Sequence, residues 1–350
     1  MINSHTISSF AGKVPEFLSN PGIGGGRYGR EGLILQLQTI NEKRFMTAVS
    51  ISAIICTYNR EKFIGAALQS LVSQTLPAEV YEILVIDNNS SDHTQDICQQ
   101  FIAAHPQYKI RYLVEMQRGV SFARNRAIRE AQSDILAYMD DDAEADPHFL
   151  ETILKFMQAH PEVVGAGGKI IPKYPETGEP RWMNRFLGGF VARQDHGEKM
   201  RKYNYFMKYP IGCNMTYRRH ILEKTAGFNT SLMFRSEDKF INHEVKKISD
   251  NIWYLPGSVV YHNIDADRVS FERFRKLYLK TGNEEKQRVL AAGGRPAWLM
   301  KLVEFIAKFG VAVLIWLGFT LTGREIKGRY TMYSQWYTLK GFLQKEVFYR

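Results

Sequence analysis

The sequence predicts an α/β fold in which helices flank a mostly parallel central sheet, and three observations support this prediction. Apolar, β-branched runs alternate with amphipathic stretches of helical period between residues 49 and 171, as in βαβ units. Of the 350 residues, 45% are hydrophobic and 13% aromatic, which is enough for a sizeable core. Polar clusters follow three of the runs, at strand ends where parallel sheets bind their ligands.

The strands and helices of the first half follow from these runs. Asp92, with Gln95 three residues later, forms a capping box that starts a helix, and Pro147 suits the first turn of another. The predicted strands are residues 49–56, 81–86, 110–114, 135–139 and 163–171. The predicted helices are residues 61–74, a segment from Asp92 onward, 121–131 and 147–160.

The second half of the sequence is less regular. Residues 211–217 predict a strand, residues 219–225 a short helix, and residues 251–261 two strand-like stretches around Pro256 and Gly257. Residues 271–282 predict an amphipathic helix that Gly282 ends. Residues 173–208 have few periodic stretches and are dense in arginine, lysine and aromatic side chains.

Three regions are expected along the chain. Residues 1–47 form a flexible N-terminal extension, since the glycine-rich stretch 21–32 lacks the Gly-Lys-Ser/Thr ending of a phosphate loop. A short strand is expected at residues 34–40 within it. Residues 48–270 form the main α/β domain, and residues 271–350 form a helical, membrane-associated region.

The charge balance and the cysteines limit the partners and the compartment. The chain has 46 Lys and Arg against 36 Asp and Glu, so its net charge of +10 favours an anionic partner. No run of like charge resembles a nucleic-acid-binding arm, so a nucleotide and a membrane surface are expected and nucleic acid is not. Three separated cysteines indicate neither a disulfide framework nor a zinc site, and no signal pattern opens the chain. We expect a cytoplasmic protein at the inner face of the cell membrane.

An apolar stretch at residues 309–323, bounded by Lys308 and Arg324, is the reason for expecting membrane association. As a helix it would be only about 22 Å long, against roughly 30 Å of hydrocarbon. A helix that lies in the membrane surface, or dips into it, is therefore favoured. A buried core or dimer helix and a membrane-spanning helix remain the alternatives.

Asp140, Asp141 and Asp142 follow one another directly after the predicted strand 135–139. Adjacent carboxylates in partly dry surroundings repel one another unless positive charge lies between them. A hard divalent cation, Mg²⁺ or Mn²⁺, shared with substrate phosphates would supply that charge. A solvated acidic turn is the alternative interpretation of this triplet taken alone.

Seven short motifs follow one another over about two thirds of the chain. They are residues 56–60 (Cys-Thr-Tyr-Asn-Arg), 85–92, 119–125, 139–142, 212–218, 236–238 and 260–262, the last followed by the helix from Arg268 to Gly282. Each motif is weak alone, but the seven in this order are specific, and they resemble family-2 glycosyltransferases with the GT-A fold. The resemblance implies a GT-A type, Rossmann-like domain that transfers a sugar from a nucleotide-diphosphate donor.

The resemblance also assigns roles in binding the donor. Tyr58 offers a ring face to the nucleotide base, and Asp87 hydrogen-bonds that base. Arg124 and Arg118 both lie where an arginine faces the nucleotide, and one of the two is expected to make only a structural ion pair. The full predicted set for the nucleotide sugar is Thr57, Tyr58, Arg60, Asp87, Arg124, Asp140 and Asp141.

The metal and the catalytic base complete the implied site. Asp142 is expected to bind the metal directly, Asp140 to bind the ribose or a metal-bound water, and Asp141 to support the turn. His262 matches a histidine that completes the metal shell, and an imidazole suits Mn²⁺ better than Mg²⁺. Asp238 matches the base that deprotonates the acceptor, with Glu237 orienting Asp238 or the acceptor. A single base implies one displacement and inversion at the anomeric carbon.

Two other functions were weighed against this one. A nucleotidyltransferase of similar architecture usually has a glycine-rich basic loop after its first strand, whereas residues 57–60 here are Thr-Tyr-Asn-Arg. A non-catalytic glycan- or nucleotide-binding relative would lack part of the metal pair or the base, which are present. The expected donor is a UDP-sugar, and the expected acceptor is a glycan or lipid-linked saccharide bound along residues 173–210.

Overall fold

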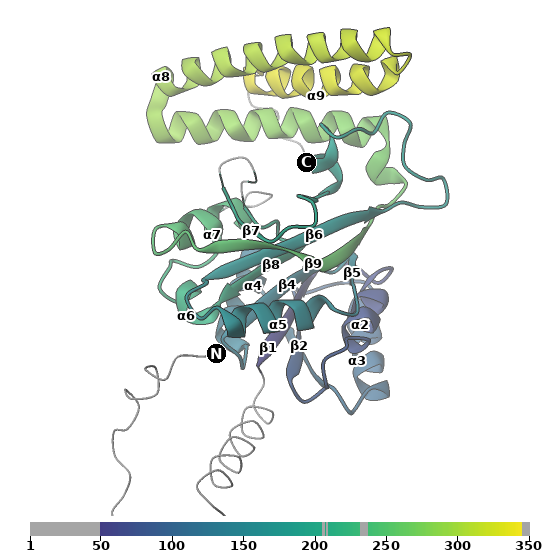
Figure 1. Ribbon diagram of the computed structural model, residues 1–350, viewed down its shortest axis with the longest axis vertical. Coiled ribbons are helices and arrows are strands. Elements are labelled where there is room, and N and C mark those ends of the chain that lie inside the picture. Colours follow the sequence, from purple (N-terminus) through teal and green to yellow (C-terminus); the bar gives the residue numbers. More distant parts are fainter. Residues whose placement is uncertain (1–49, 205–206, 208, 232–236, 345–350) are drawn as a thin grey trace, which may run out of the picture. The chain divides into compact units, whose positions relative to one another are not determined.

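Figure 1 shows the computed structural model of the protein, which describes residues 50–204, 207, 209–231 and 237–344. The glycine-rich stretch 21–32 and the strand expected at residues 34–40 lie outside these residues. Residues 46–350 group into one compact unit. The boundary expected at residue 270 within that unit stays a prediction.

The described residues form a nine-stranded sheet that is parallel in its first half. The strands β1 (Ile51–Thr57), β2 (Tyr81–Asp87), β3 (Lys109–Val114) and β4 (Ile135–Asp140) pair in parallel in the order β3-β2-β1-β4. Antiparallel pairing begins at β8 (Asn214–Arg218), which lies between β4 and β6 (Gly165–Lys173). The sheet continues through β9 (Ile252–Asn263), with β5 (Ala143–Ala145) and β7 (Arg201–Lys202) beside it.

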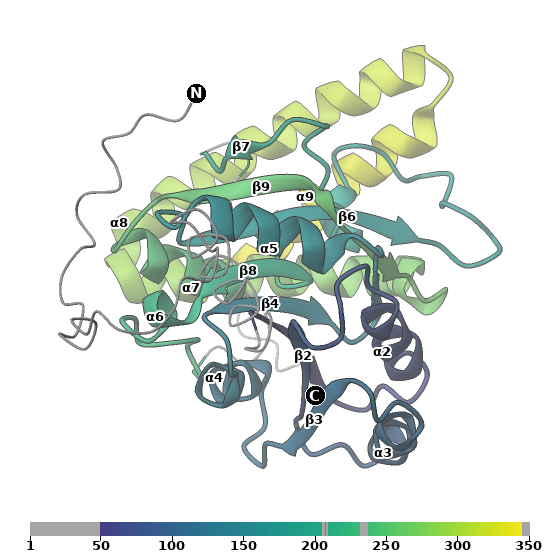
Figure 2. The ribbon, with the colours of Figure 1, turned by 60° about the horizontal axis from the view of Figure 1, so that its bottom comes forward.

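Two apolar cores hold the sheet, one on each face. The helices α2 (Ile64–Val72), α3 (Thr94–Ala104) and α5 (Phe149–Ala159) cover one face, and α4 (Val120–Glu130), α6 (Arg219–Leu222) and α7 (Glu237–Lys246) the other, as Figure 2 shows for α2, α3 and α4. Alternate residues of β1 point to opposite faces, so that Ala53 and Ile55 join one core and Ile54 the other. Burial on both faces explains why the parallel strands are apolar without alternation.

The structure confirms the α/β class and most predicted elements, and it revises the region 251–261. These residues belong to a single strand, β9, whose register with β6 shifts between Gly168 and Lys169. A Cβ atom on Gly168 would lie 1.9 Å from the backbone oxygen of Ser258, so the two backbones meet there at a distance that only glycine permits. The predicted break around Pro256 and Gly257 therefore coincides with this irregularity in one continuous strand.

The helix predicted over residues 271–282 is longer than expected, so the prediction that Gly282 ends it was wrong. The helix α8 (Phe271–Leu321) continues through Gly282 and kinks at Gly294, whose φ of 61° and ψ of −151° are non-helical. Gly282 instead allows α8 to approach α9 (Glu325–Leu343), because an added Cβ atom would lie 2.0 Å from the backbone oxygen of Thr338. Gly341 of α9 meets the backbone of α8 in the same way.

The C-terminal helices form a layer of their own, in which the second half of α8 folds back along the first (Figure 1). Aromatic residues of α9 and of the first half of α8 pack on the segment after β6, which contains the short helix η1 (Gly188–Val191). Trp182 of that segment stacks on Tyr330 and meets Phe274 edge to face. This packing links the helical layer to the rest of the unit.

Candidate active site

A cavity of about 610 Å³ opens at the carboxyl ends of β1 and β4. The parallel register aligns Thr57 with Asp87 and Cys56 with Asp140, so residues far apart in sequence meet at one edge of the sheet. The residues on the cavity wall include Thr57, Tyr58, Arg60, Asn88, Arg118, Arg124, Asp140, Asp141, Asp142, Glu237, Asp238, His262 and Arg268. All the predicted site residues except Asp87 are among them.

Asp87 lies at the end of β2 but turns into the protein. Its carboxylate accepts hydrogen bonds of 2.5 Å from the hydroxyls of Ser90 and Tyr112, and the side chain is 1% exposed. The next residue, Asn88, lines the cavity and accepts a hydrogen bond from the backbone of Gly119. Asp87 therefore shapes the strand end, and the proposed contact with the base stays a prediction.

Tyr58 and Arg118 form a platform on the wall of the cavity. Tyr58 is 40% exposed, and the guanidinium of Arg118 lies 5.2 Å from the centre of its ring. The next residue, Asn59, has a φ of 52°, and its backbone N–H donates to the Ser90 hydroxyl. An accessible ring beside a guanidinium can stack on a nucleotide base.

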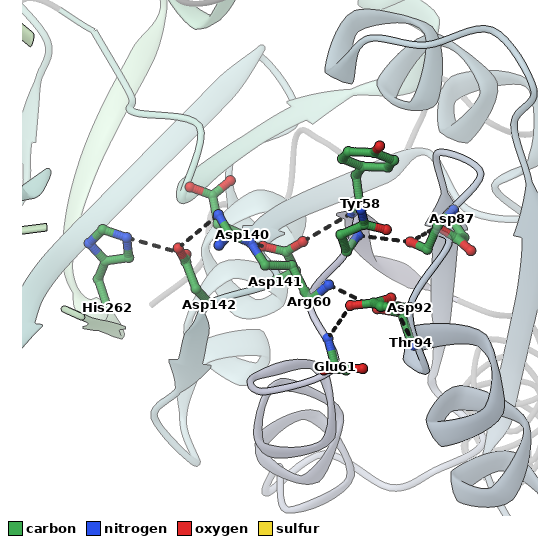
Figure 3. A network of polar contacts seen from close by, with 12 residues as sticks. Tyr58, Arg60, Glu61, Asp87, Asp92, Thr94, Asp140, Asp141, Asp142 and His262 are labelled. Carbon is green, nitrogen blue, oxygen red and sulfur yellow. Dashed lines mark hydrogen bonds and ion pairs between the residues drawn. The ribbon is translucent and has the colours of Figure 1, made fainter. Parts of the chain in front are cut away.

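The three aspartates have three different surroundings, and Figure 3 shows those of Asp141 and Asp142. Asp140 lies 3.4 Å from a guanidinium nitrogen of Arg124. Asp141 accepts from Arg60 Nε at 3.2 Å and from the backbone N–H of Tyr58 at 3.4 Å, so it braces the turn after β1. Asp142 lies 3.2 Å from His262 Nε2.

The surroundings shift the carboxyl groups in opposite directions. Burial raises the pKa of Asp141 to about 7 against the opposing charge of Arg60. Burial also acts on Asp142, but the contacts with His262 and the charges of Arg60 and Arg268 lower its pKa by more. Asp142 is therefore the carboxylate best held in its charged form.

The residues Asp142 and His262 fit a divalent cation by the chemistry of their donor atoms. His262 is 1% exposed, and its Nδ1 lies 3.1 Å from the backbone oxygen of Val191, so Nδ1 carries a proton and donates it. Nε2 is then the ring nitrogen that faces the carboxylate of Asp142. A carboxylate oxygen and an imidazole nitrogen are a common pair of metal ligands.

Asp140 does not join this pair in the present geometry. Its carboxylate faces Arg124, and the described residues contain no group of three or more His, Cys, Asp or Glu side chains placed to hold a metal ion. The direct metal contact predicted for Asp142 with His262 is thus compatible with the geometry. The other role predicted for Asp140, near the ribose or a metal-bound water, stays a prediction.

Arg124 joins two acidic residues on the wall of the cavity. It is 4% exposed, and its guanidinium pairs with Glu237 at 2.8 Å as well as with Asp140. Arg124 is therefore the arginine that makes buried ion pairs, whereas Arg118 lies beside Tyr58.

Asp238 stands at the start of α7, where two cavities meet. Its carboxylate accepts from the backbone N–H of Gly212 at 3.3 Å and from that of Lys239 at 2.7 Å. Burial, followed by the charge of Glu237, raises the pKa of Asp238, which makes it a better base. Glu237 and Asp238 also line a second cavity of about 880 Å³, whose wall includes Gly188, Arg193 and residues of α8 and α9.

Comparison with known proteins identifies this arrangement. The sequence profile described as "Glycosyl transferase family 2" matches residues 52–226. The chain belongs to glycosyl transferase family 2. The resemblance, the fold class and the assignment as a glycosyl-transferring enzyme are confirmed, and the nucleotidyltransferase and non-catalytic alternatives are set aside.

Two curated relatives of this family-2 glycosyltransferase are named as glucuronosyltransferases. It is 24% identical over 233 residues to the glucosyl-dolichyl phosphate glucuronosyltransferase of Haloferax volcanii, covering 65% of this chain and 70% of that protein. It is 33% identical over 131 residues to a glucuronosyltransferase of Methanococcus voltae. The name of that protein gives dolichyl N-acetyl-alpha-D-glucosaminyl phosphate as one substrate and a 2,3-diacetamido-2,3-dideoxy-glucuronosyl group as the other part. That match covers 36% of this chain and 40% of the relative's length.

A solved structure shares the fold of this glycosyltransferase. The mannosyltransferase PcManGT from Pyrobaculum calidifontis, solved in complex with GDP-Man and Mn²⁺, superposes with a TM-score of 0.54 at 17% identity. The match covers 89% of this chain and 95% of that one.

Sequence reasoning gave no role to Arg268 or Asn88, which also line the site. Arg268 opens the helix quoted after the last motif, and its spacing from His262 was the available signal. Asn88 lies within the quoted stretch 85–92, but the motif assigned the contact with the nucleotide base to its neighbour Asp87.

Proposed function

We propose that this glycosyltransferase moves a sugar, with inversion, from a nucleotide-diphosphate donor to a hydroxyl of a lipid-linked saccharide. The observation that supports the proposal most is the position of Asp238 on the wall shared by two cavities. The smaller cavity contains the base-stacking platform and the three aspartates and suits the donor. The larger cavity suits the acceptor. The names of the dolichyl-linked relatives agree with a lipid-linked acceptor.

The donor is held by residues at the carboxyl ends of β1 and β4. Tyr58 and Arg118 receive the nucleotide base, and Arg60 supplies a cation near the phosphates. Asp142 and His262 are the residues that would hold a divalent metal, with Asp140 nearby. A metal bound there supplies Lewis-acid stabilisation of the departing diphosphate, and the imidazole favours Mn²⁺ over Mg²⁺. A UDP-sugar is the proposed donor.

Asp238 performs the proton transfer. An acceptor hydroxyl in the larger cavity donates its proton to Asp238 as its oxygen attacks the anomeric carbon, because a free alkoxide is too unstable to form beforehand. Arg124 holds Glu237 beside Asp238, and the raised pKa of Asp238 strengthens it as an acceptor of the proton. One base and one displacement give inversion.

The second half of α8 is proposed to lie in the cytoplasmic membrane surface. Within the helix Gly294–Leu321, the most apolar window of 18 residues has a mean hydropathy of 2.0, and only 11% of that window is buried. Val303, Leu314 and Leu321 are 61%, 67% and 89% exposed on this helix. Its other side packs against α9, where Phe305 meets Phe342 and Phe309 meets Trp336.

This packing favours a surface orientation over a membrane span. The helix α9 carries Lys327, Arg329 and Lys340 along its length, and a span of α8 would take these charges toward the hydrocarbon. A helix lying in the interface keeps them among lipid head groups, where basic residues are favourable.

The function is tested by a donor screen with UDP-, GDP- and dTDP-sugars, Mn²⁺ and a lipid-linked saccharide acceptor. The intact protein is expected to use one nucleotide class. Asp238→Asn should lose transfer by about a hundredfold or more while it binds nucleotide like the parent. The exposed Asp250, in an ion pair with Lys202 outside both cavities, gives the matched control Asp250→Asn. Normal transfer by Asp238→Asn would place the base elsewhere.

A further inference from the structure

Arg268 occupies the position beside Asp142 and His262 where a bound cation would be expected. It lies in the 3₁₀ turn η2 (Asp267–Val269), between β9 and α8, and its side chain is 29% exposed on the wall of the donor cavity. Its Nη1 lies 3.1 Å from His262 Nε2 and 3.5 Å from Asp142 Oδ2.

These contacts compete for the same atoms of His262. Nδ1 donates to the backbone oxygen of Val191, so Nε2 alone faces Arg268 and Asp142. If Nε2 carries a lone pair, it accepts a hydrogen bond from Arg268, but it then faces a second acceptor, Asp142 Oδ1, at 3.2 Å. If Nε2 carries a proton, it donates to Asp142, but it then faces a second donor, Arg268 Nη1. In the first arrangement the guanidinium of Arg268 offsets the repulsion, because its Nη1 contacts both Nε2 and the other oxygen of the same carboxylate, Asp142 Oδ2.

The loop that leads to the turn of Arg268 is also fixed by an ion pair with another segment of the chain. Asp265, on the loop between β9 and η2, pairs with Lys62 at the start of the segment that leads to α2. Arg60, from the same segment, contacts Asp142 from its Nη2 at 3.5 Å. Two guanidinium groups from opposite sides of the cavity therefore neutralise one buried carboxylate.

We propose that Arg268 is a built-in counter-cation that competes with the divalent metal for Asp142 and His262 and, once displaced, binds the donor diphosphate. This inference rests on the proposed function of the site. A guanidinium pairs with phosphate through two parallel hydrogen bonds, so a donor diphosphate offers the displaced group a strong, geometrically matched partner. Metal and nucleoside diphosphate should consequently bind with positive coupling that depends on Arg268.

The test measures Mn²⁺ binding to the full chain by electron paramagnetic resonance of the free ion, with and without UDP and GDP. The variant Arg268→Gln removes the competing charge while it keeps polar hydrogen-bonding capacity. We expect it to bind Mn²⁺ alone about tenfold more tightly than the parent. The diphosphate should then enhance Mn²⁺ binding less in the variant than in the parent.

Two further variants serve as controls. Arg273→Gln removes a positive charge from the exposed start of α8, and its Mn²⁺ affinity should match the parent's. Arg268→Lys keeps the charge without the planar guanidinium. Without nucleotide, its Mn²⁺ affinity should equal that of the parent. The diphosphate should raise that affinity less than it does in the parent.

The outcomes separate this inference from the proposed function. If Arg268→Gln binds Mn²⁺ no more tightly than the parent, or keeps the full coupling, the inference is overturned. If the parent binds no Mn²⁺ with any nucleotide, and Asp142→Asn behaves identically, the proposed metal site fails instead. A thermal melt of each variant confirms folding, and Arg268→Lys carries the test if Arg268→Gln does not fold.

Discussion

Replacing Arg124 with methionine should destabilise the fold, because this arginine neutralises two acidic groups from different parts of the chain. Its side chain is 5% exposed and lies 2.8 Å from Glu237 and 3.4 Å from Asp140. Methionine fills similar space but carries no charge. The change therefore leaves Glu237, which is 14% exposed, without its cation.

The size of the effect follows from the burial of each carboxylate. Removing one partner of a buried ion pair typically costs about 3–5 kcal/mol, since an uncompensated charge stays inside. Asp140 is 37% exposed, so water screens it and its contribution is small. Glu237 then dominates, and we expect a loss of about 3 kcal/mol at the lower end of that range. For a unit of this size that corresponds to a melting point lower by about 6 °C.

Urea unfolding of four proteins measures this effect: the parent, Arg124→Met, Glu237→Gln and the double variant. The double variant should recover about half of the loss, because neither charge is then left alone, and the coupling energy should exceed about 1.5 kcal/mol. Arg129→Met is the matched control, since Arg129 is an exposed arginine on the same helix, α4. It should shift the unfolding free energy by less than about 0.5 kcal/mol.

The reasoning would be refuted by a different pattern. Equal stability of Arg124→Met and the control would show that the buried carboxylates do not need this cation. A double variant that is less stable than either single variant would show that packing, and not charge, is the main contribution of Arg124.

Three further predictions concern the base and the helical layer. The transfer rate should fall as pH decreases through the raised pKa of Asp238, because the base becomes protonated; a pH–rate profile measures this. Asp238→Asn should be more stable than the parent at neutral pH, and urea midpoints measure the difference. The folded parent favours the protonated acid, so it loses that stability as pH rises, whereas the asparagine does not titrate. Gly282→Ala should lower the melting point because the added Cβ atom would meet the backbone of α9, while Gly310→Ala, with nothing within 4 Å, should not. Leu314→Glu should weaken binding to anionic lipid vesicles in a flotation assay without changing the melting point, and unchanged flotation would argue against the membrane orientation.

The sequence predicted the parallel half of the fold because each local signal agreed with the tertiary structure. The β1 and β2 strands are buried on both faces, so apolar runs alone were sufficient. Gly282 shows where local signals fail. A glycine in a helical pattern predicts the end of the helix, but Gly282 instead allows the close approach of another helix, α9. The short strands β5 and β7 have no pattern of their own and exist because β9 lies beside them.

The same distinction holds within the site. The motifs predicted which residues gather at the sheet edge, because register and strand ends are encoded locally. They did not predict which way each side chain faces. Asp87 turns inward to Tyr112 and Ser90, and Arg268 reaches Asp142 from beyond β9, both through contacts between distant segments.

The wall of the larger cavity has a consequence for the size of acceptor that the enzyme accepts. Thr281 and Glu284 of α8 and Lys327 of α9 line this cavity together with Asp238. If α8 lies on the bilayer as proposed, rigid helices and not a flexible tether set the height of the Asp238 carboxylate above the lipid. The enzyme would then select acceptors by length, because it would favour glycans whose acceptor hydroxyl lies at that height above the lipid. Shorter or longer glycans would be poorer acceptors.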